Sequence, residues 1–192
     1  YLRSALVTAR ETDDSSVVPV CFCMLSRVNT DRGDYSAALD LVGKAKEASA
    51  QEGNRRSEAL VFHALAYCLR ISRDFDGSIE AYNSAIQIYL EEGDSHGMNE
   101  EIRNLATATF LNGEMDEAAK LLRGLQGKLS RGEPYFEAYS HVDEAILSFI
   151  EGRFEESQID IKKAHMAIEA CEQILDPDEE MVIEYLSNRI PR

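Results

Sequence analysis

The sequence has few of the residues that mark loops, disulfide-rich folds or irregular chains. Its 192 residues include 4 prolines, 11 glycines, 4 cysteines and no tryptophan, whereas 44% are hydrophobic. A chain of this length and hydrophobic content can bury a substantial core without disulfides. The residues between the apolar positions are mainly Ala, Glu, Arg, Lys and Gln, which lose little side-chain freedom in helices. We therefore expect an all-α protein.

Positive charge and long apolar runs are also scarce. The chain has 20 Lys and Arg against 35 Asp and Glu, a formal net charge of -15, and no basic run offsets it. Such a chain repels a phosphate backbone, so we expect no nucleic-acid partner. No apolar stretch approaches the roughly 20 residues that cross a bilayer, and YLRSALVTARETDD at the start lacks the layout of a signal peptide. We expect no membrane partner and a cytoplasmic location.

Motifs for catalysis, cofactors and metals are missing. Cys21 and Cys23 would point roughly 200° apart in a helix, so they cannot share a metal, and all four cysteines are predicted to be reduced, mostly buried thiols. No phosphate loop, G-x-S-x-G or H-E-x-x-H occurs. His141 and Glu144 share a helical face but supply only two ligands. We predict no enzyme activity, no cofactor and no metal site.

A repeat of about forty residues organises the chain. The similar stretches are GDYSAAL (33–39), RDFDGSI (73–79), GEMDEAA (113–119) and GRFEESQ (152–158). We use Gly33, Arg73, Gly113 and Gly152 as anchors. Large apolar residues follow two positions after each anchor and small residues five positions after it, namely Tyr35, Phe75, Met115, Phe154 and Ala38, Ser78, Ala118, Ser157. Further apolar positions continue at helical spacing, which predicts a helix after each anchor.

A second helix is predicted before each anchor. Small residues lie seven positions before the anchors, at Ser26, Ala66, Ala106 and Ala145. Three copies also have apolar residues eight and eleven positions before the anchor, whereas the fourth has Glu144 and His141 there, so we expect its first helix to be rotated, shifted or more exposed. Gly53, Gly93 and Gly132 are expected to end the second helices, and Asn54 and Asp94 to cap the next ones.

This pattern resembles the tetratricopeptide repeat over about residues 17–175. FHALAYCLRISRDFDGSIEAY (62–82) and IRNLATATFLNGEMDEAAKLL (102–122) carry it best, with Leu-Ala in the first helix and an acid, a large apolar and a small residue around the second. The period exceeds the usual 34 and is similar to the extended variety of bacterial regulators. The closing proline of the family is absent. The resemblance implies an α-α superhelix, a right-handed solenoid of stacked helical hairpins.

The whole chain, 1–192, is therefore interpreted as a single repeat domain. We expect a partial repeat at 1–14, four repeats at 17–53, 54–93, 94–132 and 133–175, and a capping helix at 176–190. Leu2 and Ala5 are in phase with a second helix, so we expect the chain to be a fragment of a longer protein. In the last helix, Asp176 is the expected N-cap, with Pro177 in the first turn and Glu179 completing a capping box.

The resemblance places a concave binding face on the first helix of each repeat. The predicted groove consists of Arg27, His63, Tyr67, Arg70, Arg103, Thr107 and Phe110. Arginine binds carboxylates through paired hydrogen bonds, and aromatic rings hold apolar neighbours. We predict a protein or peptide ligand with acidic or C-terminal carboxylate groups. The alternative is that these arginines only balance nearby glutamates.

The same stripe is apolar in the fourth copy, at Tyr139, Val142, Ile146 and Phe149. It is either an interface for a partner or a surface buried by the last helix or a neighbouring domain. We predict a non-catalytic protein- or peptide-binding scaffold, the sensor or interaction module of a larger signalling or transcriptional regulator. The alternatives are a module that forms homodimers and a small-molecule inducer domain of a transcription activator.

Overall fold

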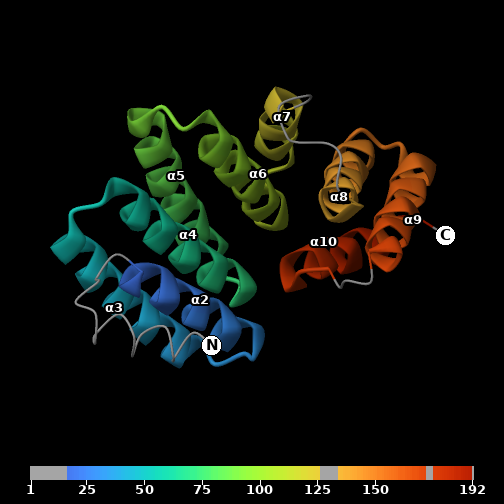
Figure 1. Cartoon of the computed structure of the whole chain (residues 1–192). Helices are drawn as coiled ribbons and strands as arrows, with labels where there is room; N and C mark the ends of the chain where they lie inside the picture. The colour runs from blue at the N-terminus through green and yellow to red at the C-terminus, as the bar shows by residue number, and fades with distance from the viewer. Residues whose placement is uncertain (1–16, 126–133, 172–174, 192) are drawn as a thin grey trace. The chain divides into compact units, whose positions relative to one another are not determined.

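The structure, a computed structural model, describes residues 17–125, 134–171 and 175–191. Its regular structure in these ranges is entirely helical (Figure 1). The helices are α2 (Val18–Asp31), α3 (Tyr35–Glu52), α4 (Arg55–Ile71), α5 (Phe75–Glu92), α6 (Ser95–Leu111), α7 (Met115–Leu125), α8 (Pro134–Ile150), α9 (Phe154–Ala170) and α10 (Pro177–Ser187). None of these described helices combines the length and the apolar character needed to cross a membrane. The predicted partial repeat at 1–14 and Gly132 lie outside the described residues.

The helices pair in chain order. α2 packs against α3, α4 against α5 and α8 against α9, and a short turn of the same kind joins α6 to α7. Each pair falls within one of the four ranges expected for the repeats. Helix pairs that follow one another in this way define an all-α helical solenoid, so the predicted fold class is confirmed.

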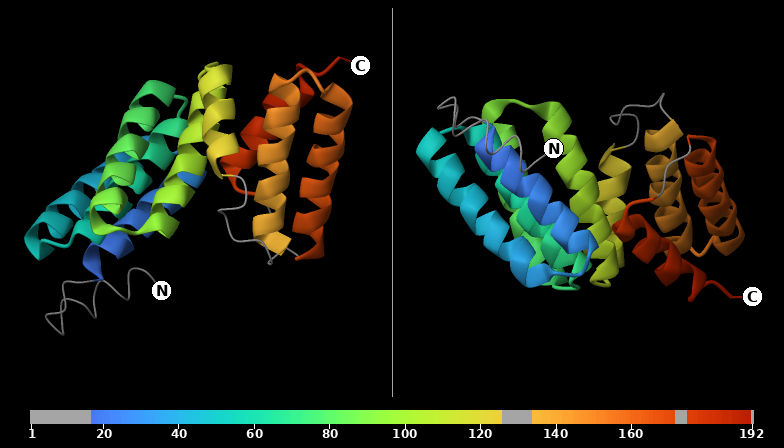
Figure 2. Two further views of the ribbon diagram at one scale, coloured as in Figure 1. Left: turned by 90° about the horizontal axis from the view of Figure 1, so that it is seen from above. Right: turned by 60° about the horizontal axis from the view of Figure 1, so that its bottom comes forward.

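The chain divides into two compact units, Tyr1–Glu101 and Ile102–Arg192, with the boundary inside α6. In the first unit, the hairpins α2/α3 and α4/α5 lie side by side, because both α2 and α3 contact α4. In the second unit, α8 and α9 form a long hairpin, and α8 also contacts α7 and α10 (Figure 2). Each candidate site described below belongs to one of these units.

The turn inside each hairpin has the same hydrogen bonds in all four copies. The backbone N–H that follows the anchor donates to a carbonyl five residues earlier, over 2.8 to 3.0 Å, in the pairs Asp34–Asn29, Asp74–Leu69, Glu114–Thr109 and Arg153–Ser148. The anchor itself adopts the left-handed conformation, with φ of 78°, 69°, 92° and 75° along the chain. Three anchors are glycine, which adopts this conformation without strain, and the second is Arg73.

Replacing Arg73 by glycine is expected to stabilise the protein. The left-handed conformation costs a residue with a side chain roughly 1–2 kcal/mol, and the greater chain entropy of unfolded glycine offsets part of that gain. We expect the free energy of unfolding, measured by urea denaturation, to rise by about 0.5–1 kcal/mol. Arg73→Ala removes the same charge but keeps the Cβ atom and should bring no such gain. Equal stability of the two variants would exclude backbone strain at Arg73.

The turns between hairpins use glycine and a capping side chain, as predicted. Gly53 and Gly93 end α3 and α5 with φ of 68° and 69°. The Asn54 side chain then accepts hydrogen bonds from the backbone N–H groups of residues 56 and 57, and Asp94 accepts one from residue 97. These local bonds satisfy the first N–H groups of α4 and α6.

Small residues let the two helices of a hairpin approach closely. In three copies, a buried serine hydroxyl of one helix donates to an alanine carbonyl of the other, over 2.8 to 3.0 Å, in the pairs Ser26–Ala38, Ser78–Ala66 and Ser157–Ala145. The serine belongs to the first helix in the first copy and to the second helix in the other two. The third copy has Ala106 and Ala118 at these offsets. All eight residues are fully buried.

Candidate functional site

The predicted groove residues of the first unit belong to one polar network. We call Arg27, Asp31, His63, Tyr67, Arg70 and Glu101 the unit 1 network. The Tyr67 hydroxyl donates a hydrogen bond of 2.7 Å to Asp31 Oδ1. The Arg27 guanidinium lies 4.9 Å from the centre of the Tyr67 ring, and that of Arg70 lies 5.9 Å from it. Tyr67 is therefore held at its hydroxyl and flanked by two cations.

His63 extends this network to α6. Its Nδ1 atom lies 2.9 and 3.1 Å from the two carboxylate oxygens of Glu101, which is only 4% exposed. Burial lowers the pKa of His63, whereas the charge and the hydrogen bond of Glu101 raise it, and the net shift is upward. Arg70 and Arg27 oppose the upward shift. Glu101 thus favours the protonated imidazole.

The upward pKa shift of His63 predicts a pH dependence of stability. A group whose pKa is raised by folding stabilises the folded state fully below its unfolded pKa, 6.5 for His63, and this contribution is lost as the pH rises through the folded pKa. Between about pH 6 and 8, the free energy of unfolding of the wild type should fall relative to that of His63→Gln. Urea denaturation at several pH values measures it. Parallel pH profiles would contradict the prediction.

In the second unit, Arg103 is the centre of a buried ion-pair cluster. We call Arg103, Tyr139, Asp143, Asp176 and Glu179 the Arg103 cluster. Arg103 Nε lies 3.2 Å from Asp143 Oδ2, and Nη2 lies 2.8 Å from Glu179 Oε1. The guanidinium also lies 4.3 Å from the centre of the Tyr139 ring, whose hydroxyl donates to Asp176 Oδ2 over 2.7 Å. The cluster therefore links α6 to α8 and α10.

The environment of the Arg103 cluster shifts two pKa values upward. Burial lowers the pKa of Arg103, but the charges of Asp143 and Glu179 raise it more. Burial raises the pKa of Asp143 to about 6, against the opposing effect of Arg103. Arg103 therefore stays charged, and the pKa of Asp143 lies above its usual range despite the neighbouring arginine.

Four residues that the sequence assigned to the groove surface are interior positions, among them Tyr67, which is 4% exposed. Arg70 is 1% exposed, Thr107 is 2% exposed and Phe110 is fully buried. Phe110 packs edge-on against Tyr185 of α10 at a centroid distance of 5.0 Å. Arg103 is bound to the carboxylates of Asp143 and Glu179. This agrees with the alternative stated for the groove, in which the arginines balance nearby acidic residues. Arg27, His63 and Arg103 are the groove residues that stay partly exposed, and of these Arg103 is bound to two carboxylates.

The apolar stripe of the fourth copy is mostly buried within the second unit. Tyr139, Val142 and Ile146 are at most 7% exposed. Helix α10 contacts α8, and Tyr185 lies 6.5 Å from the ring centre of Phe149. The stripe is thus covered by the last helix, which is one of the two outcomes that the sequence left open.

The capping box predicted for α10 is wrong. Asp176 occupies the N-cap position and Pro177 begins the helix, but the Asp176 side chain makes no capping hydrogen bond. It accepts from Tyr139 instead, and Glu179 binds Arg103. A buried guanidinium attracts a carboxylate more strongly than a backbone N–H does, so tertiary partners replace the local cap. The carboxylates of Asp176, Asp178 and Glu179 lie within 4.8 Å of one another. The charge of Asp178 also acts on Arg103, so we add Asp178 to the Arg103 cluster and assign these carboxylates to that cluster rather than to a metal.

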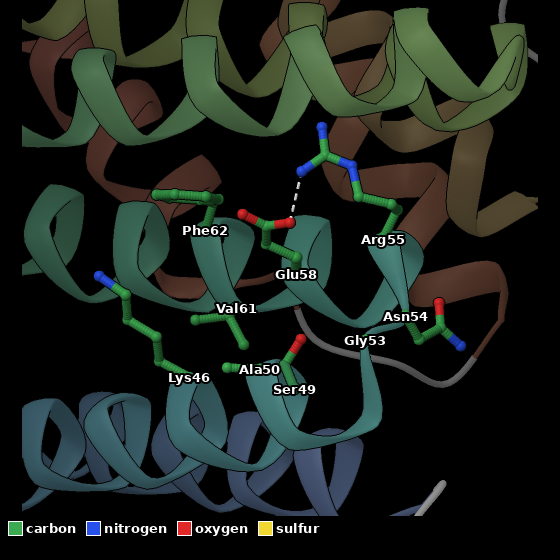
Figure 3. A pocket seen from close by; sticks show the side chains of 9 residues that line it. All are labelled: Lys46, Ser49, Ala50, Gly53, Asn54, Arg55, Glu58, Val61 and Phe62. Carbon is green, nitrogen blue, oxygen red and sulfur yellow. Dashed lines mark hydrogen bonds and ion pairs between the residues drawn. The ribbon is translucent and has the colours of Figure 1, made fainter.

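A pocket of about 300 Å³ lies between α3 and α4 in the first unit (Figure 3). Val61 and Phe62 of α4 form its apolar wall, and the Gly53–Asn54 turn lies at one end. The Arg55 guanidinium is bound to Glu58 and Glu91. Lys46 of α3 also lines the pocket and forms no ion pair among the described residues. The pocket therefore combines apolar surface with one available cation.

The fold and these clusters define a protein built from tandem helical hairpins. The solved structure of BtubC (BKLC) from P. vanneervenii is similar, with a TM-score of 0.67 and 17% sequence identity over 91% of this chain and 73% of that one. At this identity the similarity concerns the fold alone. No family model matches the sequence, and a comparison with curated proteins finds no match.

Proposed function

We propose that the chain is a non-catalytic module that binds a protein or peptide, as the sensor or interaction part of a larger signalling or transcriptional regulator. The tetratricopeptide-like repeat pattern and the consecutive helical hairpins support this function. The observation that carries the proposal is the partly exposed Arg27 beside the buried Tyr67 ring, with the partly exposed His63 one turn before Tyr67 on α4.

The unit 1 network favours a ligand with acidic or C-terminal carboxylate groups. The Tyr67 ring restricts Arg27 from one side, and Tyr67 is itself fixed by its hydrogen bond to Asp31. A cation that is ordered before binding loses less conformational entropy when it binds a carboxylate. The planar guanidinium can then form two parallel hydrogen bonds with that carboxylate.

Binding to an array of acidic peptides, each with a free or an amidated C-terminus, tests the proposal. Arg27→Ala should weaken binding about tenfold or more, because a charged hydrogen bond contributes roughly 1.5–3 kcal/mol. Arg56→Ala is the matched control, since it removes the same charge from an exposed ion pair with Asp94. Equal effects of the two variants would overturn the proposal. Arg70 and Arg103 are unsuitable for this test because Arg70 is buried and Arg103 is already bound to two carboxylates.

The pocket between α3 and α4 favours a second candidate function, the binding of a small inducer molecule. An apolar wall with Lys46 nearby suits a small amphipathic carboxylate. Ala50 is exposed and lines the pocket, so Ala50→Leu would fill it. None of the residues that line the pocket belongs to the unit 1 network. A thermal-shift screen with medium-chain carboxylates should show stabilisation of the wild type that Ala50→Leu abolishes. Stabilisation of neither protein would exclude this function.

A further inference from the structure

Three apolar positions of the repeat are replaced by metal-ligand residues in the fourth copy only. They lie eleven and eight positions before the anchor and eight positions after it. The first three copies have Phe22, Leu25, Leu41, then Phe62, Leu65, Ala81, then Ile102, Leu105, Leu121. The fourth copy has His141, Glu144 and Asp160. A general drift of the repeat toward polar residues would not select an imidazole and two carboxylates together.

The fold brings these three side chains together within the second unit. His141 and Glu144 lie one turn apart on α8, and Asp160 comes from α9 of the same hairpin. One nitrogen or oxygen atom of each residue lies within 4.8 Å of the other two. Asp160 is 8% exposed. The sequence pattern indicated only two ligands, His141 and Glu144, and the fold brings Asp160 of the neighbouring helix beside them as a third.

The state of His141 points to a missing partner. Its Nδ1 atom is buried and makes no hydrogen bond among the described residues, although it lies 3.4 Å from Glu144 Oε2. A buried imidazole nitrogen without a hydrogen bond is costly, and a bound cation would satisfy it. The two nearby carboxylates would neutralise the charge of that cation.

We propose that His141, Glu144 and Asp160 bind a divalent transition metal of the zinc type. One imidazole and two carboxylates suit Zn²⁺ better than Mg²⁺ or Ca²⁺, which prefer oxygen ligands alone. Three protein ligands leave a coordination position for water or for a ligand from another molecule. The site is independent of the peptide-binding function proposed for the unit 1 network.

Lys163 supplies the positive charge of this site when no metal is bound. Its Nζ atom lies 2.8 Å from Asp160 Oδ1, and its side chain is 49% exposed. An exposed lysine three residues along the same helix can swing into solvent at little cost. The lysine competes with a metal ion for the negative charge of Asp160, so Lys163→Gln should tighten metal binding, whereas loss of a ligand should weaken it.

Isothermal titration calorimetry with ZnCl₂ tests the proposal. The half-buried Cys171 thiol is removed as a competing ligand by using the Cys171→Ser background. We expect one equivalent of Zn²⁺ to bind, with affinity at least about tenfold lower in His141→Ala and in Asp160→Asn. His96→Ala is the matched control, because His96 and Glu100 form an exposed pair at 3.3 Å.

A second variant separates ligation from folding. His141→Phe introduces the residue that two other copies have at this position, so it should retain the helical circular-dichroism spectrum and lose the metal. Visible absorption of bound Co²⁺ should be present in the parent protein and absent in His141→Phe. The proposal is overturned if His141→Ala binds Zn²⁺ as tightly as His96→Ala, or if the parent binds less than one equivalent.

Discussion

Replacing Arg103 by alanine is expected to lower the free energy of unfolding by about 3–5 kcal/mol. The substitution leaves two carboxylates without the guanidinium that compensates their burial. Glu179 has a side chain only 2% exposed and that of Asp143 is 14% exposed, so water can replace little of the lost interaction. Removing one partner of a buried ion pair is costly because the remaining charge has lost its solvent.

Urea denaturation followed by circular dichroism measures this loss. Arg55→Ala is the matched control, since Arg55 binds Glu58 and Glu91 at the surface, where such pairs contribute at most about 1 kcal/mol. The deficit of Arg103→Ala should shrink at about pH 5, because the pKa of Asp143 is about 6 and a protonated carboxyl no longer needs the arginine. A loss as small as that of Arg55→Ala would contradict a buried cluster.

Replacing Ile146 by alanine is expected to cost about 2–5 kcal/mol of stability. Ile146 lies on α8 and is fully buried, so the change removes buried apolar surface and leaves a cavity. Thermal and urea denaturation measure the loss. Met166→Ala on α9 serves as the control because Met166 is 68% exposed, and such a substitution changes stability by no more than about 0.5 kcal/mol.

Sedimentation of the same variants distinguishes a core residue from an interface residue. If the stripe of Ile146 is core, Ile146→Ala lowers the unfolding midpoint and leaves the sedimentation coefficient of the folded protein unchanged. If the stripe pairs two copies of the chain, the variant keeps its stability and dissociates instead. The second result would restore the homodimer alternative, in which this stripe forms the contact.

The helix pairs were predictable because local rules determine the backbone here. Gly33, Gly113 and Gly152 stand where the chain must turn with positive φ, and Asn54 and Asp94 cap the helices that follow. These signals act within five or six residues, so a single sequence displays them completely. Recurrence at an interval of about forty residues then indicates that the same hairpin forms four times.

The partners of the predicted groove residues were not predictable from the same offsets. Tyr67 pairs with Asp31, His63 with Glu101 and Arg103 with Asp143, across 36, 38 and 40 residues. Each partner therefore belongs to the adjacent repeat, where an acidic residue has many alternatives in a chain with 35 Asp and Glu. A search for polar or basic residues that lie about forty residues from an Asp or Glu would have found these three pairs.

The burial of the groove residue Phe110 depends on an element outside the repeat. Phe110 and Phe149 occupy the same offset before their anchors, and both contact Tyr185 of α10. Because α10 lies outside the repeat, the repeat offsets do not predict that this helix packs on α8. For the same reason, the capping box expected at Asp176 and Glu179 was wrong, since both side chains have partners in the second unit.

The serine hydroxyls inside the hairpins limit how the helices of this chain can be recombined. Exchanging a complete hairpin for another preserves the donor and the acceptor together. Joining α2 to α5 would instead bring Ser26 and Ser78 face to face, and the reciprocal pairing of α4 with α3 would bring together two alanines and no hydroxyl. A duplication that copies both helices as one piece therefore keeps the serine–alanine hydrogen bond of the hairpin.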